Sequence, residues 1–171
     1  MFIETKEIGP EGLRVSRSID AFRLPVSDGD SIRIETVQLN GELQPDQGGF
    51  SFVGRIEAAA TLSCSRCLEE YSLPLDLPFD LIYTTSPEGG AGEDNRIDEE
   101  MVTVTRFDGA RIDLMSLLAE QLYLGLPLKP LCRPDCLGLC PRCGTNLNAG
   151  TCACAEVRTE DPRLRFLKNL L

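Results

Sequence analysis

Eight cysteines are the residues of this chain whose type and spacing most directly suggest chemistry. They form four close pairs, which are Cys64 with Cys67, Cys132 with Cys136, Cys140 with Cys143, and Cys152 with Cys154. Two thiolates from one tight turn can bind the same ion, and two such pairs complete the tetrahedron that Zn²⁺ prefers, at about 2.3 Å per sulfur. The pattern therefore predicts two Zn²⁺ ions per chain. Both sites would be structural, because four sulfurs leave no open position for water or substrate.

The order of the pairs favours one site built from Cys140, Cys143, Cys152 and Cys154. The turn around Cys140 has a proline at its rigid entry and a glycine at its permissive exit, and the polar connector TNLNAGT is of hairpin length. By parity, the first two pairs would form the other site and would tie a turn between two strands to the segment after a helix. Alternatively, Cys132 or Cys136 joins the later group and leaves the other one free.

Three other uses of paired cysteines compete with zinc. An iron–sulfur cluster also takes four thiolates, and spacing alone does not exclude it. A redox pair depends on a helix N-terminus that lowers a thiol pKa, whereas Cys64 and Cys67 lie between strand-like runs and precede acidic residues. Disulfides need an oxidising compartment. The start MFIETKEIGPEGL lacks a basic region followed by an apolar stretch, so we expect a cytoplasmic protein.

The composition argues against most enzyme classes. The chain has no histidine, so it lacks the ring needed for Ser–His or Cys–His pairs and for His-bound catalytic metals. It also has no glycine-rich phosphate loop of the Walker type. No uninterrupted apolar segment approaches the roughly 18–20 residues of a membrane helix. We therefore expect no catalytic residues, no small-molecule substrate and no membrane contact.

Charge is distributed unevenly along the chain. The formal net charge is −10, and residues 1–126 carry 23 acidic against ten basic side chains. Residues 127–171 carry seven basic against four acidic side chains. The acidic region favours a protein partner over nucleic acid, whereas the arginines of the C-terminal region could touch RNA phosphate or simply form a solvated surface. These arginines are Arg133, Arg142, Arg158, Arg163 and Arg165.

The apolar pattern predicts the elements that position the cysteines, and it indicates an α+β fold. Residues 1–86 alternate with period two between turn residues, which predicts an antiparallel meander. An acidic, glycine-containing stretch at 86–100 is expected to be a mobile loop, followed by a short strand at 101–107. Residues 112–125 have helical period, with Asp113 as N-cap, and this helix is expected to cover the sheet.

The predicted domain organisation is a β-rich α+β domain at residues 1–126 and a cysteine-rich, zinc-binding tail at residues 127–171. The tail has few apolar residues until its end, where a short helix is expected at 161–171 because Pro162 follows an N-cap acid. Metal would therefore contribute folding free energy that the tail cannot obtain from a core.

Several segments resemble the YceD-like family, which is described as large ribosomal RNA subunit accumulation proteins. They are TLSCSRCL at 61–68, LYLGLP at 122–127, CLGLCPRCGTNLN at 136–148, Cys152-Ala153-Cys154, and Asp161-Pro162-Arg163. The resemblance implies a cytosolic bacterial or organellar factor for accumulation of large-subunit ribosomal RNA, with no catalytic residues. Its expected partner is a ribosomal protein or a pre-ribosomal particle. A thiol–disulfide redox protein and a zinc-dependent protein-binding adaptor remain the alternatives.

Overall fold

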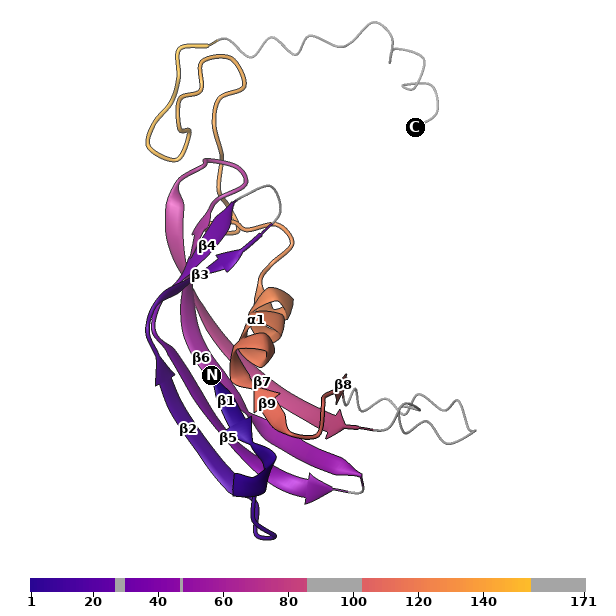
Figure 1. Ribbon diagram of the computed structural model, residues 1–171. Helices are drawn as coiled ribbons and strands as arrows, with labels where there is room; N and C mark the ends of the chain where they lie inside the picture. Colours follow the sequence, from indigo (N-terminus) through magenta and orange to yellow (C-terminus); the bar gives the residue numbers. More distant parts are fainter. Residues whose placement is uncertain (27–29, 47, 86–102, 155–171) are drawn as a thin grey trace, which may run out of the picture.

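The computed structural model describes residues 1–26, 30–46, 48–85 and 103–154 (Figure 1). Within these ranges the chain is mostly antiparallel β-sheet with one α-helix. The predicted acidic loop at 86–100 and the predicted helix at 161–171 lie outside the described residues. The elements are β1 (Phe2–Glu4), the 3-10 helix η1 (Thr5–Glu7), β2 (Leu13–Ile19), β3 (Phe22–Pro25), β4 (Ser31–Ile34), β5 (Val37–Asp46), β6 (Gly49–Ser63), β7 (Glu70–Thr84), β8 (Thr103–Arg106), β9 (Arg111–Asp113) and α1 (Leu114–Gly125).

Strand β6 organises the main sheet, which has seven strands. It pairs with β7 along its whole length, with β5 over residues 49–57, and with β4 at residues 60–61. Strand β2 adds to β5, and β3 adds to β4. Strands β1 and β9 form a separate two-stranded sheet. The meander predicted from the alternation is therefore present in β5, β6 and β7.

The remaining strands depart from a simple meander. Strand β2 skips to β5 instead of pairing with β3, and β8 runs parallel to β7. A parallel pair needs a long connection instead of a tight hairpin, and residues 85–102 supply that length. Period-two alternation identifies strands but carries no information on the order of their partners, so the sequence could not give this topology.

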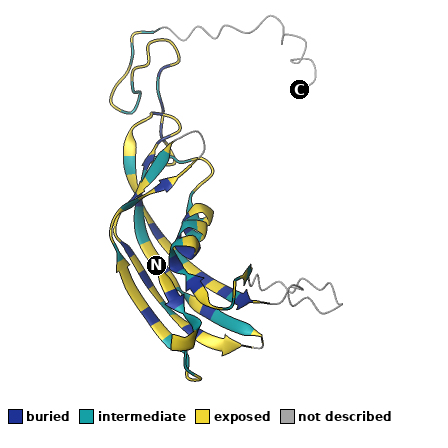
Figure 2. Cartoon of the chain, in the orientation of Figure 1, coloured by how far each residue is buried: buried dark blue, intermediate teal, exposed yellow. Residues whose placement is uncertain are grey.

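The sheet is strongly bent, and its inner face carries the main apolar core. Buried and exposed residues alternate along the strands, as Figure 2 shows. The register places Leu43 opposite Phe52, and both are fully buried. The Phe52 and Phe79 rings meet edge to face with centroids 5.0 Å apart. A Cβ on Gly54 would lie 2.7 Å from the Phe79 ring, so glycine is required for this close approach.

Helix α1 begins where the sequence pattern predicts an N-cap. The Asp113 carboxylate accepts hydrogen bonds from the Met115 N–H at 3.0 Å and from the Ser116 hydroxyl at 3.1 Å. The helical run predicted from residue 112 starts two residues too early, because Ile112 and Asp113 belong to β9 and α1 begins at Leu114. The buried residues of the helix are Leu114, Leu117, Leu118 and Leu122, and they belong to the same apolar cluster as the sheet. No helix in the described ranges is both long enough and apolar enough to cross a membrane.

Residues 127–154, here called the cysteine segment, follow α1 and lie beyond the end of the sheet where β6 turns into β7 (Figure 1). Its described part contains neither helix nor named strand, apart from an isolated bridge between Leu139 and Asn146. Within it, the buried side chains are those of Cys136 and Cys140, while Leu128 and Leu137 are exposed. This segment therefore lacks an apolar core of its own.

Candidate metal centres

The turn between β6 and β7, residues 64–69, holds the first cysteine pair. The Cys64 N–H donates to the Glu69 carbonyl at 2.9 Å, and the Leu68 N–H donates to the Cys64 carbonyl at 2.9 Å. These two bonds close the chain around the pair, and the two Sγ atoms lie within 4.8 Å of each other. Sequence analysis predicted this turn correctly.

Residues 140–145 repeat the same turn in the cysteine segment. The Cys140 N–H donates to the Thr145 carbonyl at 2.8 Å, and the Gly144 N–H donates to the Cys140 carbonyl at 2.9 Å. Gly144 has a φ of 72°, in the left-handed region that glycine enters without a Cβ clash. Two segments that are distant in sequence thus use one backbone design to present a Cys-x-x-Cys pair.

The structure gathers the eight cysteines into two groups of four. Site A consists of Cys64, Cys67, Cys132 and Cys136, and site B consists of Cys140, Cys143, Cys152 and Cys154. Within each group all four Sγ atoms lie within 4.8 Å of one another. This is the grouping that the parity of the pairs favours, and no cysteine is left over. Either group could hold a metal ion.

The sulfur separations fit a single ion with four sulfur ligands. In site A, Cys64 Sγ lies 3.7 Å from Cys136 Sγ, and Cys67 Sγ lies 3.7 Å from Cys132 Sγ. Four sulfurs at about 2.3 Å from one zinc would stand about 3.8 Å apart in a regular tetrahedron. A disulfide would need about 2.05 Å, and all eight cysteines are free. A four-iron cluster binds each thiolate on a separate iron, which would spread the sulfurs further.

Each site contains at least one thiol whose pKa is lowered, Cys64 in site A and both Cys140 and Cys143 in site B. The backbone N–H of Cys67 is the main cause that lowers the pKa of Cys64, to about 6. In site B, the hydroxyl of Thr145 is the main cause that lowers the pKa of Cys143, to about 6. An ion that approaches either site near neutral pH therefore meets one thiolate already formed.

Each site also contains two thiols whose pKa is raised, Cys67 and Cys132 in site A and Cys152 and Cys154 in site B. Burial is the main cause that raises the pKa of Cys132 to about 12. Its hydrogen bond to Cys143 is the main cause that raises the pKa of Cys154 to about 12. A bound ion needs four thiolates, so metal binding must release these protons, and metal affinity falls as the pH is lowered.

Neither turn has the setting of a redox Cys-x-x-Cys pair. Such pairs use a helix N-terminus to activate one thiol, but residues 64–69 follow a strand and residues 140–145 lie in irregular chain. In the described ranges the α-helix is α1, and it begins at Leu114, away from both pairs in sequence. The low pKa values here arise from local hydrogen bonds that serve equally well to prepare a metal ligand.

Asn148 connects the two sites. In the sequence it lies between Cys143 and Cys152 of site B. Its side-chain amide Nδ2 donates to Cys136 Sγ of site A at 3.3 Å. Its Oδ1 accepts from the Leu137 N–H at 2.8 Å and from Arg133 Nη2 at 2.8 Å. The connector of one site therefore orients a ligand of the other.

Arg66, in the first turn, makes a second link. Its carbonyl accepts from the Leu139 N–H at 3.1 Å, and its Nη1 donates to the Cys136 carbonyl at 2.7 Å. Gly138, with a φ of 76°, lets the chain pass so close that a Cβ there would lie 3.0 Å from the Arg66 carbonyl oxygen. The two sites thus share a continuous hydrogen-bonded backbone.

Sequence analysis missed Asn148, Arg66 and Leu68. Leu68 has a φ of 62°, which is unusual for a residue with a branched side chain, and it is 66% exposed. Aligning the two Cys-x-x-Cys turns would have found it, because it occupies the place of Gly144. The roles of Asn148 and Arg66 depend on contacts across the fold and leave no local signal.

Replacing Leu68 by glycine is expected to stabilise the metal-loaded protein by up to about 1 kcal/mol. The left-handed conformation costs a non-glycine residue roughly 1–2 kcal/mol, part of which is offset by the greater freedom of glycine in the unfolded chain. Denaturant unfolding measures the change. Leu137→Gly is the matched control, because Leu137 is equally exposed but has no positive φ, and it should destabilise. Equal losses in both variants would show that the turn carries no strain.

Comparison with known proteins adds a family to this geometry. The family model described as large ribosomal RNA subunit accumulation protein YceD matches residues 52–171, which is more than half of the chain and includes all eight cysteines. No solved structure matches the chain significantly.

Three curated relatives illustrate the similarity. An uncharacterized protein of Mycobacterium tuberculosis (strain ATCC 25618 / H37Rv) is 32% identical over 99 residues, covering 58% of this chain and 45% of the relative. Two others are named large ribosomal RNA subunit accumulation protein YCED homolog 1, chloroplastic. The Zea mays protein is 26% identical over 72% of this chain and 47% of the relative. The Arabidopsis thaliana protein is 24% identical over 90% of this chain and 52% of the relative. The chain thus spans about half the length of these relatives.

Proposed function

The chain belongs to the YceD family of large ribosomal RNA subunit accumulation proteins, and from this premise we propose that it is a non-enzymatic factor supporting large-subunit ribosomal RNA accumulation. The observation that carries the proposal is the gathering of all eight cysteines into two closed groups of four. Such groups stabilise a fold and offer no open coordination position for catalysis. The factor is expected to act in the cytoplasm of a bacterial cell.

The proposed metal is Zn²⁺, with two ions per chain. All eight proposed ligands are sulfur. The separations of 3.7 Å in site A match a tetrahedral ion, and in site B the Sγ atoms of Cys140 and Cys152 lie 3.4 Å apart within a group of the same size. When bound, zinc would hold the cysteine segment against the end of the sheet, because two ligands of site A come from the β6–β7 turn and the other two come from the cysteine segment. The apolar neighbours of site A, Tyr71, Leu131 and Leu139, would pack around the ion.

We further propose that the chain consists of two units, one acidic and one zinc-dependent. Residues 1–126 would form the acidic, β-rich unit with α1 as the main cover of its sheet, a role supported by the four buried leucines that α1 contributes to the apolar cluster. Residues 127–171 would form the zinc-dependent unit. The partner of the acidic unit would be a basic ribosomal protein, and Arg133 and Arg142 of the other unit would contact ribosomal RNA.

Loss of the protein is expected to lower the ratio of large- to small-subunit ribosomal RNA during demanding growth. The deletion strain should regain the ratio with the wild-type chain but not with a Cys64→Ser, Cys140→Ser double variant, because each substitution breaks one four-sulfur group. Quantifying both RNAs on gels or by sequencing gives the ratio. An unchanged ratio in the deletion strain would overturn the proposal.

A zinc-dependent protein-binding adaptor is the second candidate, and the same closed sites would suit it. Purification of the native protein with its partners separates the two functions. Pre-ribosomal components should accompany the protein if it supports ribosome assembly. Their absence, with other proteins bound instead, would favour the adaptor. A thiol–disulfide redox protein would instead turn over a disulfide substrate, which we do not expect from the hydrogen-bonded turns described above.

A further inference from the structure

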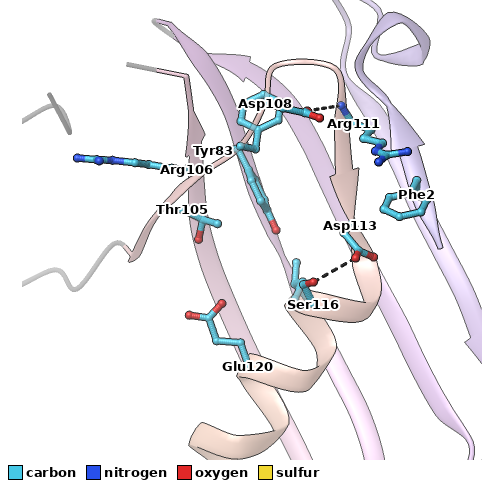
Figure 3. Close-up of a pocket in the computed structure, with 11 residues that line it drawn as sticks. Phe2, Tyr83, Thr105, Arg106, Asp108, Arg111, Asp113, Ser116 and Glu120 are labelled. Atoms are coloured by element: carbon cyan, nitrogen blue, oxygen red, sulfur yellow. Dashed lines mark hydrogen bonds between the residues drawn. The ribbon is translucent and has the colours of Figure 1, made fainter. Parts of the chain in front are cut away.

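A cavity of about 300 Å³ is lined by residues of α1, β7, β8 and β9 (Figure 3). Of these elements, β8, β9 and the N-terminal end of α1 lie away from the cysteine segment (Figure 1). We infer that the cavity binds the ammonium or guanidinium group of a lysine or arginine side chain presented by a basic protein partner. Three features of its lining carry this inference: a tyrosine hydroxyl to which no described residue hydrogen-bonds, a free carboxylate and apolar walls. The inference rests on the proposed function only for the source of the basic segment.

The hydroxyl belongs to Tyr83, whose ring is buried. The residue is 4% exposed, and its ring meets the Phe107 ring edge to face, with centroids 5.9 Å apart. Figure 3 shows the hydroxyl pointing toward α1, on the side of Ser116 and Glu120. No residue that the structure describes hydrogen-bonds to it, and every fully buried side-chain polar atom in the described ranges has a partner, so this oxygen faces the open cavity. Its lone pairs are therefore free to accept a hydrogen bond from an incoming donor.

The free carboxylate belongs to Glu120, which projects from the exposed side of α1 beside the cavity (Figure 3). Asp113 also lies close, but its oxygens are used by the Met115 N–H, the Ser116 hydroxyl and the N-terminal ammonium of Met1, 3.7 Å away. Burial first, and then the negative charges of Glu120 and Asp113, raise the pKa of Tyr83. The hydroxyl therefore stays neutral in a field that attracts cations.

Two arginines line the cavity without cancelling this field. The Arg111 guanidinium lies 4.4 Å over the Phe2 ring, at the other side of the cavity. Arg106 extends away from the Tyr83 hydroxyl in Figure 3. Asp108 is also committed, because it accepts from the Ala110 and Arg111 N–H groups. The oxygens around Tyr83 are therefore left without a cation from the lining.

The shape and charge together fit a long cationic side chain. Leu117, which is 2% exposed, and the rings of Phe107 and Tyr83 offer apolar walls to an aliphatic stem, while Glu120 and the hydroxyl receive the charged head. The volume is at the lower end of the range for ligand cavities, which suits a side chain better than a large cofactor. The excess of 13 negative charges over residues 1–126, the part of the chain that lines the cavity, would favour the approach of a basic polypeptide.

Nα-acetyl-lysine amide and Nα-acetyl-arginine amide are the probes, and backbone amide NMR shifts of residues 116–120 follow their binding to the metal-loaded chain. Both probes should bind saturably, whereas Nα-acetyl-norleucine amide, which keeps an aliphatic stem without the charge, should not. Glu120→Gln should weaken binding about fivefold, as expected for one partly exposed ion pair. Tyr83→Phe removes only the hydroxyl and should also weaken it.

Glu57→Gln is the matched control, because Glu57 is exposed on β6 outside the cavity and its loss should leave binding unchanged. Equal binding of the norleucine and lysine derivatives, or unchanged binding in Glu120→Gln, would overturn the inference. This measurement uses the purified chain alone. If deletion lowers the ratio of large- to small-subunit ribosomal RNA as expected but the purified chain does not bind the lysine and arginine derivatives, the cavity's role is rejected and the proposed function stands.

Discussion

Stripping the two proposed zinc ions from the protein with a strong chelator is expected to unfold residues 130–154 while the sheet stays folded. The cysteine segment has almost no buried apolar side chains besides Cys136 and Cys140, so it has little else to offset the entropy of ordering its backbone. Structural zinc contributes about 10–16 kcal/mol of apparent binding free energy in small zinc-folded peptides. Losing this contribution should release the segment completely.

Hydrogen exchange followed by mass spectrometry measures the effect. The amides of Leu139, Cys140, Gly144 and Leu147 are hydrogen-bonded within or beside the two sites. Their exchange should accelerate by about a thousandfold or more without metal. The paired strands β5 and β6 give the internal control, because their core of Leu43 and Phe52 does not involve metal. Full protection of the four amides in the chelated protein would contradict the account.

Substituting Asn148 by alanine is expected to weaken zinc binding at site A by about 10–100-fold, although Asn148 lies between the ligands of site B. Outer partners of metal ligands typically contribute an effect of this size. The amide Nδ2 donates to Cys136 Sγ, and this bond stabilises the thiolate that zinc requires. The substitution also frees the Leu137 N–H and the Arg133 guanidinium that hold the loop around Cys136.

Competition with a chromophoric chelator gives both affinities, and cadmium NMR of the substituted protein identifies the weakened site. Asn148→Asp separates the two roles, because it keeps the accepting oxygen but replaces the donor with a negative charge beside the sulfur. Asn40→Ala is the matched control, since Asn40 is exposed on β5 and bonds to Ser16. If Asn148→Ala and Asn40→Ala bind zinc at site A equally well, the two sites are not coupled through Asn148.

Local patterns predicted the parts of this molecule that depend on neighbouring residues. The α1 stripe of four leucines, the Asp113 cap and the turn that carries Cys64 and Cys67 all follow from spacing within a few residues. The two groups of cysteines were also predicted, because short spacings leave few ways to bring two pairs to one ion. Their role as zinc ligands stays a prediction.

Contacts between distant segments could not be predicted in the same way. The parallel pairing of β8 with β7 depends on which edge of the sheet remains open after the hairpins form. The hydrogen bond from Asn148 to Cys136 depends on how the connector folds back over the first site. The Tyr83 cavity exists only because α1 and β8 approach β7 from different parts of the chain. None of these residues stands out by type or spacing.

The metal content of the chain, purified without added metal and weighed intact by non-denaturing mass spectrometry, tests the central claim most directly. The claim is that eight sulfurs hold two zinc ions and thereby fold the cysteine segment. The spectrum should show the chain with two zinc ions, and Cys64→Ser and Cys140→Ser should each lose one of them. A metal-free chain, or one that carries iron in place of zinc, would contradict it.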